Sequence, residues 1–428
     1  MPITKLTVEN FKGIAAATEF EIRPITIFLG ANSSGKSSCI HALTALAQTL
    51  KLGNSTPSLV LDDDYAHVHL GRFIEIAHSK TYAEAIKIGV DVGDVFLGKF
   101  NKDDDDVQGN CRANYSFRST MRTQEVYVES AQISVGPVSV SIKRGTKAPY
   151  AFSASIEPGK DRLLVDRANN FIFRSRYEQL SDSKLSGPQR SALLRTFFML
   201  ESSQKHIERI LRETLYLGPF RQSPLRRYPF RGMSAAEVGP QGEATITMLA
   251  GEYVQAQDRP HVKQINTWLT AMNLAKNVDL ARVGTSDLFD VKLTLPDGNK
   301  LPIADLGYGL SQVLPVLTQC TFAPQSSTLL FEQPELHLHE NAAKKLAGVF
   351  HETAKKKQAH IVLETHSKEL VYEFLQLLKT KKLAVEDLAI YMVQRKDGAS
   401  NYKRVGLELD EAGNLEVSDP WVKALTEH

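Results

Sequence analysis

Residues 30–38 read Gly-Ala-Asn-Ser-Ser-Gly-Lys-Ser-Ser and fit the pattern G-x-x-x-x-G-K-[ST]. The apolar run Ile25–Leu29 before them predicts a buried strand, and residues 39–47 after them predict an amphipathic helix. Strand, glycine-rich loop and helix form the context in which this motif binds phosphate. Gly30 and Gly35 let backbone N–H groups surround a phosphate close to a helix N-terminus. The sequence therefore predicts a nucleotide-binding protein.

The predicted nucleotide contacts extend over the whole of this loop. Lys36 would reach the β- and γ-phosphates, and the Ser37 hydroxyl would take one Mg²⁺ position. The loop residues predicted to contact the nucleotide are Gly30, Ala31, Asn32, Ser33, Ser34, Gly35, Lys36, Ser37 and Ser38. The same residues predict Mg²⁺ as a cofactor.

Composition and charge narrow the class of protein. A length of 428 residues predicts two lobes, or one domain with a large insertion. The net charge of +2 does not indicate nucleic-acid binding by the molecule as a whole, and the three cysteines are too far apart to predict a disulfide framework or a zinc cluster. The N-terminus alternates like a strand and unlike a signal peptide, and no apolar run approaches the ~20 residues that span a membrane. We expect a cytoplasmic protein with no membrane partner.

Sequence periodicity changes along the chain. Residues 85–175 alternate polar with β-branched or aromatic side chains and predict antiparallel strands, while residues 187–217 predict a helix. From about 286 to 395, apolar strands alternate with helical segments, as in an α/β sheet. We predict an α/β fold in which a nucleotide-binding core is interrupted by a mixed insertion. The predicted parts are residues 1–80 (core, N-terminal part), 81–213 (β-rich and helical insertion) and 214–428 (core, C-terminal part).

Two further strands end in candidate catalytic residues. Residues 328–332 form an apolar run that ends in Glu332, and Pro334 then turns the chain out of the sheet. At the carboxyl edge of the sheet, Glu332 can hold the hydration shell of Mg²⁺, whereas the alternative is an ordinary solvated glutamate. The next strand, residues 360–364, leads to His366, which can contact the γ-phosphate or the attacking water. A structural histidine is the alternative.

A glycine-rich turn lies between the loop and these strands. Residues 305–315 read Asp-Leu-Gly-Tyr-Gly-Leu-Ser-Gln-Val-Leu-Pro and predict a turn that runs into a helix N-terminus. The functional interpretation is a second phosphate-facing helix end that serves the nucleotide of another subunit. A simple turn and helix cap is the alternative. The residues concerned are Gly307, Gly309, Ser311 and Gln312.

The order of these motifs resembles the ABC-type ATPases of the OLD, SMC and RecF group. It is most similar to the stand-alone bacterial "AAA family" ATPases related to OLD nucleases and phage-defence ATPases. Residues 8–12, 216–221 and 238–243 also agree with that group, and the resemblance covers roughly 1–78, 214–250 and 286–395. It implies an ABC-ATPase core with ATP as the nucleotide, residues 30–38 as the Walker A loop, Glu332 at the Walker B position and His366 as the switch histidine.

The resemblance also implies how such a protein works. Two subunits would sandwich two ATPs head to tail, with residues 306–312 at the signature position and Lys12 in contact with the nucleotide. A homodimer or higher homo-oligomer that hydrolyses ATP would then act as a switch for a separate effector, a nuclease or toxin, in anti-phage defence. The segment after His366 is too short for the catalytic domain of an OLD nuclease, so we expect the effector to be another polypeptide.

Three alternatives to this function remain open. The first is a DNA-repair or recombination ATPase of the RecF or SMC type, although no heptad arm is visible. The second is a transporter nucleotide-binding subunit, which the long insertion disfavours. The third is a scaffold that binds ATP without hydrolysing it.

The chain departs from the family pattern at two places. Gln333 occupies the position of the glutamate that serves ABC ATPases as general base, and an amide cannot accept a proton. Glu335 is the nearby carboxylate that could replace it, and otherwise we expect slow hydrolysis. Gly307 stands where the signature motif has serine, which leaves Gly309 and the helix N-terminus to meet a γ-phosphate.

Two other clusters carry weaker signals. His337 and His339 alternate along one segment, but an i, i+2 pair lacks the third and fourth ligands of a zinc site. The densest basic and aromatic cluster consists of Arg221, Arg226, Tyr228, Arg227, Phe230 and Arg231. Contact with nucleic acid or phosphate is one interpretation of this cluster, and ion pairing with acidic side chains is the other.

Overall fold

The computed structural model describes residues 2–52, 57–98, 107–136, 138–145, 152–156, 163–175, 186–410 and 414–426. The chain folds into two compact units. The first consists of residues 1–22, 33–214 and 394–401, and the second of residues 23–32, 215–393 and 402–428. The chain thus passes from the second unit to the first within the predicted phosphate-binding loop, between Asn32 and Ser33.

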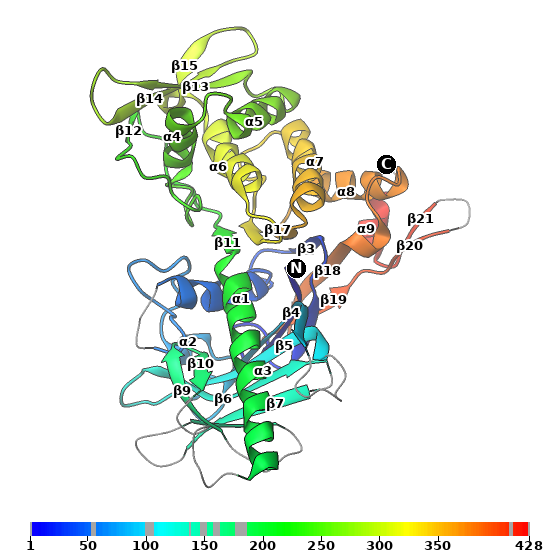
Figure 1. Ribbon diagram of the computed structural model, residues 1–428. Helices are drawn as coiled ribbons and strands as arrows, with labels where there is room; N and C mark the ends of the chain where they lie inside the picture. The colour runs from blue at the N-terminus through cyan, green and yellow to red at the C-terminus, as the bar shows by residue number, and fades with distance from the viewer. Residues whose placement is uncertain are drawn as a thin grey trace. The chain divides into compact units, whose positions relative to one another are not determined.

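The first unit is built on an antiparallel sheet, which has nine strands among the described residues (Figure 1). In spatial order they are β10 (Ile172–Ser175), β9 (Leu163–Asn169), β8 (Phe152–Ile156), β7 (Val138–Arg144), β6 (Val126–Val135), β5 (Val107–Ser119), β4 (Ile86–Gly98), β1 (Ile3–Glu9) and β2 (Thr18–Glu21). The strands predicted between 85 and 175 are confirmed. Because β4 pairs with β1, residues on both sides of position 80 share one sheet. The predicted boundaries at 80 and 213 remain a prediction.

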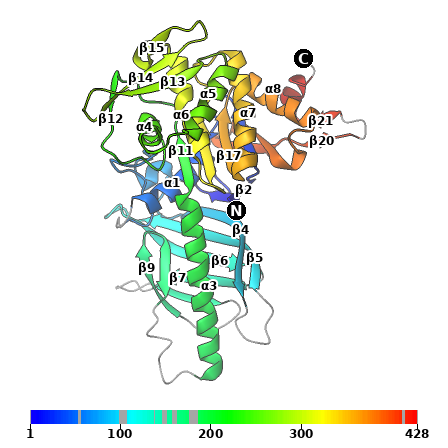
Figure 2. The same cartoon turned by 45° about the horizontal axis from the view of Figure 1, so that its top comes forward.

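Two helices cover the apolar face of this sheet. Figure 2 shows α3 (Gly187–Arg212) lying across the strands, and its residues contact β4, β6, β8 and β10. Alternate residues of β5 and β6 are buried, and the aromatic rings of Tyr115, Phe117 and Phe171 pack against one another beneath the helix. The α3 helix begins at Ser186, whose hydroxyl accepts a hydrogen bond from the Gln189 backbone N–H in a capping box.

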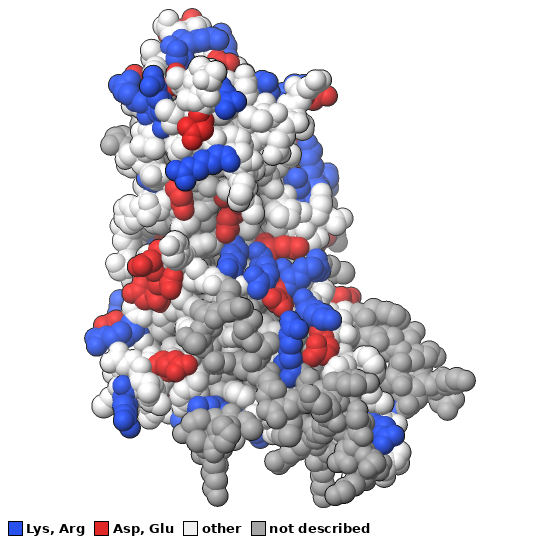
Figure 3. Space-filling view, turned by 60° about the vertical axis from the view of Figure 1, so that its left-hand side comes forward, with Lys and Arg blue, Asp and Glu red and all other residues white. Residues whose placement is uncertain are grey.

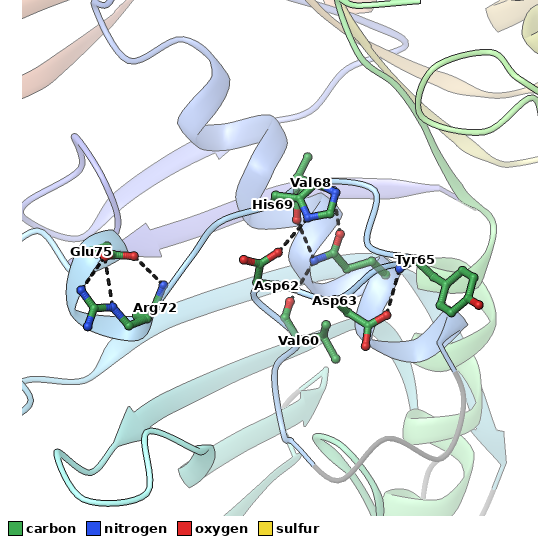
Figure 4. Close-up of polar contacts among 9 residues, drawn as sticks. Val60, Asp62, Asp63, Tyr65, Val68, His69, Arg72 and Glu75 are labelled. Atoms are coloured by element: carbon green, nitrogen blue, oxygen red, sulfur yellow. Dashed lines mark hydrogen bonds and ion pairs between the residues drawn. The ribbon is translucent and has the colours of Figure 1, made fainter. Parts of the chain in front are cut away.

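The other helix, α1 (Ser37–Lys51), follows the phosphate-binding loop and anchors the segment after it. The buried Gln48 side chain donates to the Val60 carbonyl at 2.9 Å and accepts from the Val68 backbone N–H at 3.0 Å. Figure 4 shows how this segment continues on the surface, with His69 paired to Asp62 and Arg72 to Glu75 at the short helix α2 (Phe73–Ile76). The segment is therefore held from inside by Gln48, while its side-chain pairs on the surface remain exposed.

The second unit contains the predicted α/β sheet. Its order is β11 (Thr214–Leu217), β16 (Thr328–Glu332), β17 (His360–Thr365), β3 (Ile25–Gly30), β18 (Leu388–Lys396) and β19 (Ala399–Arg404). The four strands from β16 to β18 are parallel, and the central ones are almost continuously buried, as expected for strands covered on both faces. The tip of the β18–β19 hairpin, residues 394–401, is counted with the first unit.

Helices and two small sheets complete this unit (Figure 1). The helices are α4 (Thr245–Gln255), α5 (Pro260–Ala271), α6 (Tyr308–Phe322), α7 (Glu340–Lys357), α8 (Lys368–Lys379) and α9 (Pro420–Ala424), with 3₁₀ turns at Ile303–Asp305 and Val385–Asp387. The small sheets contain β12 (Arg227–Pro229), β14 (Leu288–Thr294), β13 (Asn277–Arg282) and β15 (Lys300–Pro302), and β20 (Leu407–Leu409) with β21 (Leu415–Val417). The helices bury apolar side chains against the parallel sheet in one core.

The predicted C-terminal end of one helix is wrong. The helix expected over 187–217 stops at Arg212, and Thr214–Leu217 forms β11 at the edge of the parallel sheet. All four of these residues are buried, so the sheet gains apolar contacts that a continuing helix would not make.

In the part of the chain that the structure describes, no helix has the length and apolar character needed to cross a membrane.

Candidate functional site

The parallel register brings three strand ends to one edge of the second unit. Glu332 at the end of β16 lies opposite Glu364 of β17, and Thr365 lies opposite Leu29 of β3. The carboxyl ends of parallel strands form the edge at which α/β proteins bind ligands. Glu332, the residues around His366 and the start of the phosphate-binding loop at Gly30 therefore meet at this edge.

The phosphate-binding loop has the backbone form that its glycines predict. Gly35 has φ +103°, a conformation that side chains with Cβ rarely adopt, and α1 starts at Ser37 directly after Lys36. Ala31, Asn32 and Ser33 are exposed, Gly30, Gly35 and Ser37 are half-buried, and Ser34, Lys36 and Ser38 are buried. The loop ends at a helix N-terminus, as an anion-binding loop requires.

Within the first unit, the turn at residues 10–13 lies against this loop and its helix. Lys12 Nζ is 2.5 Å from Nδ1 of His41, which lies one helical turn beyond Ser37 on α1. The Ser400 hydroxyl donates to the Ser34 carbonyl at 2.7 Å, and the Ser400 backbone N–H donates to the Gly13 carbonyl. The structure therefore brings Lys12 to the phosphate-binding helix, and it adds Ser400 as a support of the loop.

In the second unit, the carboxylate of Glu332 is buried and held by a tyrosine. The Tyr216 hydroxyl on β11 donates to Glu332 Oε1 at 2.8 Å, and both side chains are less than one-tenth exposed. Burial, together with the negative charge of Glu332, raises the pKa of Tyr216, so its hydroxyl keeps the proton that it donates. The sequence indicated residues 216–221 but not this role of Tyr216.

Arg221 holds the backbone at the same strand end. Its guanidinium donates to the carbonyls of Gln333 at 3.0 Å and Glu332 at 3.2 Å. Burial lowers the pKa of Arg221 to about 10, and the nearby Glu335 carboxylate opposes this change. Arg221 thus remains charged at neutral pH although it is buried. Its hydrogen bonds fix the backbone at the point where the chain leaves the sheet after Glu332.

For part of the basic and aromatic cluster, the structure decides between the two interpretations. Arg221 is buried, and Arg226 and Arg227 form ion pairs with Asp305 and Asp290, so ion pairing is confirmed for these two residues. On the face drawn in Figure 3, lysine and arginine side chains lie next to aspartate and glutamate side chains.

After Glu332 the chain makes a tight turn, residues 333–338, which we call the 333–338 turn. Gln333 and His337 have positive φ values of 45° and 64°. The Gln333 backbone N–H donates to the Glu364 carbonyl at 2.8 Å, which ties the turn to the end of β17. Glu335 Oε1 accepts hydrogen bonds from the Thr365 hydroxyl at 2.6 Å and from the His366 backbone N–H at 3.1 Å. Gln333, Glu335 and His366 are therefore brought together.

A hollow of about 610 Å³ opens beside this turn, within the second unit. It is rich in acidic and histidine side chains. Its lining includes Asn32, Gln333, Glu335, His337, Glu340 and His366. Asn32 belongs to the phosphate-binding loop, so one of the predicted nucleotide contacts lines this hollow.

The predicted signature segment lies at the start of α6. Gly307 is exposed and precedes the first turn, whereas Ser311 and Gln312 are buried in the helix. A Cβ added at Gly309 would lie 3.0 Å from the His337 carbonyl, so the first turn of α6 packs closely on the 333–338 turn. Contact of these residues with a nucleotide remains a prediction.

Zinc binding by His337 and His339 finds no support. Among the described residues, no group of three or more His, Cys, Asp or Glu side chains could hold a metal ion. His339 instead caps α7, where its ring nitrogen accepts from the Asn341 backbone N–H.

Two family models match parts of the chain that carry this arrangement. Residues 1–180 match the family described as "AAA ATPase domain". Residues 268–371 match the family described as "AAA domain, putative AbiEii toxin, Type IV TA system". The first match contains the phosphate-binding loop, and the second contains Glu332, Gln333 and His366. No curated protein matches this chain in sequence.

The similar solved structures include three Smc head domains at low sequence identity. The SMC head domain from Thermotoga maritima is 11% identical, covers 95% of this chain and 100% of that chain, and has a TM-score of 0.41. An SmcHead bound to the C-winged helix domain of ScpA is 13% identical, with 94% and 98% covered and a TM-score of 0.47. An Smc head domain bound to the C-terminal domain of ScpA derived from Pyrococcus furiosus is 10% identical, with 94% and 96% covered and a TM-score of 0.42.

Proposed function

We infer that this chain is an ABC-type ATPase that acts as a slow ATP-controlled switch. The observation that carries this proposal is the strand end at Glu332. A buried carboxylate, oriented by Tyr216 and braced by Arg221, is followed by a glutamine where a general base is expected. This combination preserves the acidic side chain suited to Mg²⁺ and lacks the group that would speed hydrolysis.

The loop residues would hold ATP, and the residues present fit it. The left-handed Gly35 lets the backbone N–H groups turn toward a phosphate at the start of α1. Lys36 would contact the β- and γ-phosphates, Ser37 would take an Mg²⁺ position, and Glu332 would act on the hydration shell of the ion. Bound Mg²⁺ would neutralise charge on the phosphates, while Gln333 would orient a water molecule without accepting its proton.

We propose that ATP joins two copies of the chain and that the joined state is the signal. In this arrangement the exposed Gly307 and the N-terminus of α6 meet the nucleotide held by a second copy. Slow hydrolysis makes the ATP-bound dimer long-lived. A separate effector, a nuclease or toxin, would respond to it in anti-phage defence, a setting suggested by the toxin–antitoxin description of the family that matches residues 268–371.

Measurements of the ATP turnover rate and of the oligomeric state together test the proposed switch. We would measure ATP hydrolysis and sedimentation of the wild type, Gln333→Glu and Lys36→Ala with ATP, ADP and no nucleotide. A missing general base typically costs about 10²–10⁴ in rate, so Gln333→Glu should raise turnover at least about tenfold. The wild type should dimerise with ATP, and Lys36→Ala should not. Fast wild-type turnover that Gln333→Glu leaves unchanged, or sedimentation indifferent to ATP, would refute the proposal.

The effector is tested in the native host. Tagged wild type and Lys36→Ala are purified in parallel with ATP present, and co-purifying proteins are assayed for nuclease and toxin activity. The proposal expects one such activity with the wild type and none with Lys36→Ala. Purification of both proteins without any such activity would argue against the effector.

A further inference from the structure

One oxygen of the Glu335 carboxylate is engaged by two hydrogen bonds inside the second unit. Oε1 accepts from the Thr365 hydroxyl at 2.6 Å and from the His366 backbone N–H at 3.1 Å. Oε2 is buried and has no hydrogen-bond partner among the described residues. A general base must present a lone pair to a water molecule, but Oε1 is occupied by two hydrogen bonds and Oε2 is buried away from solvent. Glu335 therefore does not substitute for the base that Gln333 lacks.

We propose that Glu335 is a positioning residue, a latch that sets the backbone of His366 from the 333–338 turn. This inference rests on the ATPase site proposed above and assigns a regulatory element to it. Charge-assisted hydrogen bonds to a carboxylate are shorter and stronger than neutral ones, so one side chain can hold the loop. The backbone N–H of His366 is held directly, and the ring is attached to that fixed backbone.

The latch extends through Thr365 into the next helix. The Thr365 hydroxyl donates to Glu335 and accepts from the Ser367 backbone N–H at 2.9 Å. The Ser367 hydroxyl accepts from the Leu370 backbone N–H at 3.0 Å and so caps α8. Three consecutive residues, 365–367, are thus fixed between the end of β17 and the start of α8.

The other side of the latch touches the signature segment. The 333–338 turn is closed by its own hydrogen bonds, from Leu336 N–H to the Gln333 carbonyl and from Leu338 N–H to the Glu335 carbonyl. Its His337 carbonyl lies against Gly309 in the first turn of α6. A displacement at the start of α6 would therefore be passed through a rigid turn and the Glu335 carboxylate to His366. The latch couples the surface proposed to meet a second subunit to the switch histidine.

Two substitutions separate a latch from a base. Glu335→Gln keeps an oxygen that can accept from Thr365 and His366, whereas Glu335→Ala removes it. A misplaced catalytic loop can cost about 10²-fold in rate, so we expect Glu335→Ala to lower kcat about ten- to hundredfold with little change in KM for ATP. Glu335→Gln should recover most of that loss. Glu340→Gln, an exposed acidic residue lining the same hollow, is the matched control.

Amide hydrogen exchange of residues 360–370 in the nucleotide-free protein provides a readout that does not depend on activity. Exchange at His366 should become at least about tenfold faster in Glu335→Ala and in Thr365→Val, and remain slow in Glu335→Gln. If Glu335→Gln loses as much activity as Glu335→Ala, Glu335 is a base. If His366 exchange is the same in all variants, there is no latch. Absence of ATP hydrolysis in the wild type would instead refute the proposed function, while the exchange comparison still tests the latch.

Discussion

Replacement of Tyr216 by phenylalanine isolates the hydrogen bond that holds Glu332. The substitution removes one oxygen atom and leaves the buried ring in place. The lost bond spans 2.8 Å to Glu332 Oε1, and both partners are buried. A hydrogen bond to a charged group contributes about 1.5–3 kcal/mol, because removal of the donor leaves the charge less well satisfied. We expect Tyr216→Phe to lower the free energy of unfolding of the second unit by about that amount.

This change can be measured selectively. The two tryptophans, Trp268 and Trp421, both belong to the second unit, so tryptophan fluorescence during urea unfolding of the full chain reports on it. Tyr228→Phe is the control, because the Tyr228 hydroxyl only accepts from the Leu225 backbone N–H at a half-buried position. A neutral bond of this kind is worth about 0.5–1.5 kcal/mol.

A double-mutant cycle with Glu332→Gln then gives the coupling between the two side chains. The reasoning predicts that Tyr216→Phe costs less when Glu332 is already an amide, since the charged acceptor is gone. If Tyr216→Phe destabilises no more than Tyr228→Phe, or if the cycle shows no coupling, then Tyr216 does not orient Glu332 in solution. If Tyr216→Phe hydrolyses ATP at the wild-type rate, the Tyr216 hydroxyl is also not needed for catalysis.

Two other predictions concern packing and pH. In Gly13→Ala, the added Cβ would clash with Ser400 Oγ and displace it from the Ser34 carbonyl. We expect thermal unfolding to show a loss of about 0.5–1.5 kcal/mol, the value of one neutral hydrogen bond. Gly187→Ala, where no atom lies within 4 Å of the added Cβ, should stay close to wild type. Burial raises the pKa of Cys111 and of Cys320 to about 12, so these thiols should react with Ellman's reagent only after unfolding at pH 8. In the unfolded chain these thiols ionise at a lower pH than in the folded protein. Their contribution to the free energy of unfolding is therefore fully present below their ordinary pKa and is lost between about pH 9 and pH 12. Urea titrations across that pH range would detect the loss. Rapid labelling of the native protein, or a flat alkaline profile, would contradict this.

The phosphate-binding loop was predictable from the sequence because its parts are contiguous. Gly35, Lys36 and Ser37 follow one another, and the left-handed conformation of Gly35 is a local property of that residue. The buried strands before the loop and at residues 328–332 were equally predictable, since a continuous apolar run of that length is typical of a parallel strand. The strand β11 was missed because four residues at the end of a helical pattern carry too little periodicity to show a change of structure.

By itself, the sequence determined which chemical groups are present: a phosphate-binding loop, an acidic strand end, and a glutamine in place of a base. Only the tertiary structure decided what orients them, because the partners lie far apart along the chain. Tyr216 reaches Glu332 across 116 positions, Thr365 reaches Glu335 across 30, and Ser400 reaches Ser34 across 366. Such pairs depend on strand order and register in the sheet, which local hydrophobic patterns do not encode. For this reason Glu335 is a candidate base in the sequence and a latch in the fold.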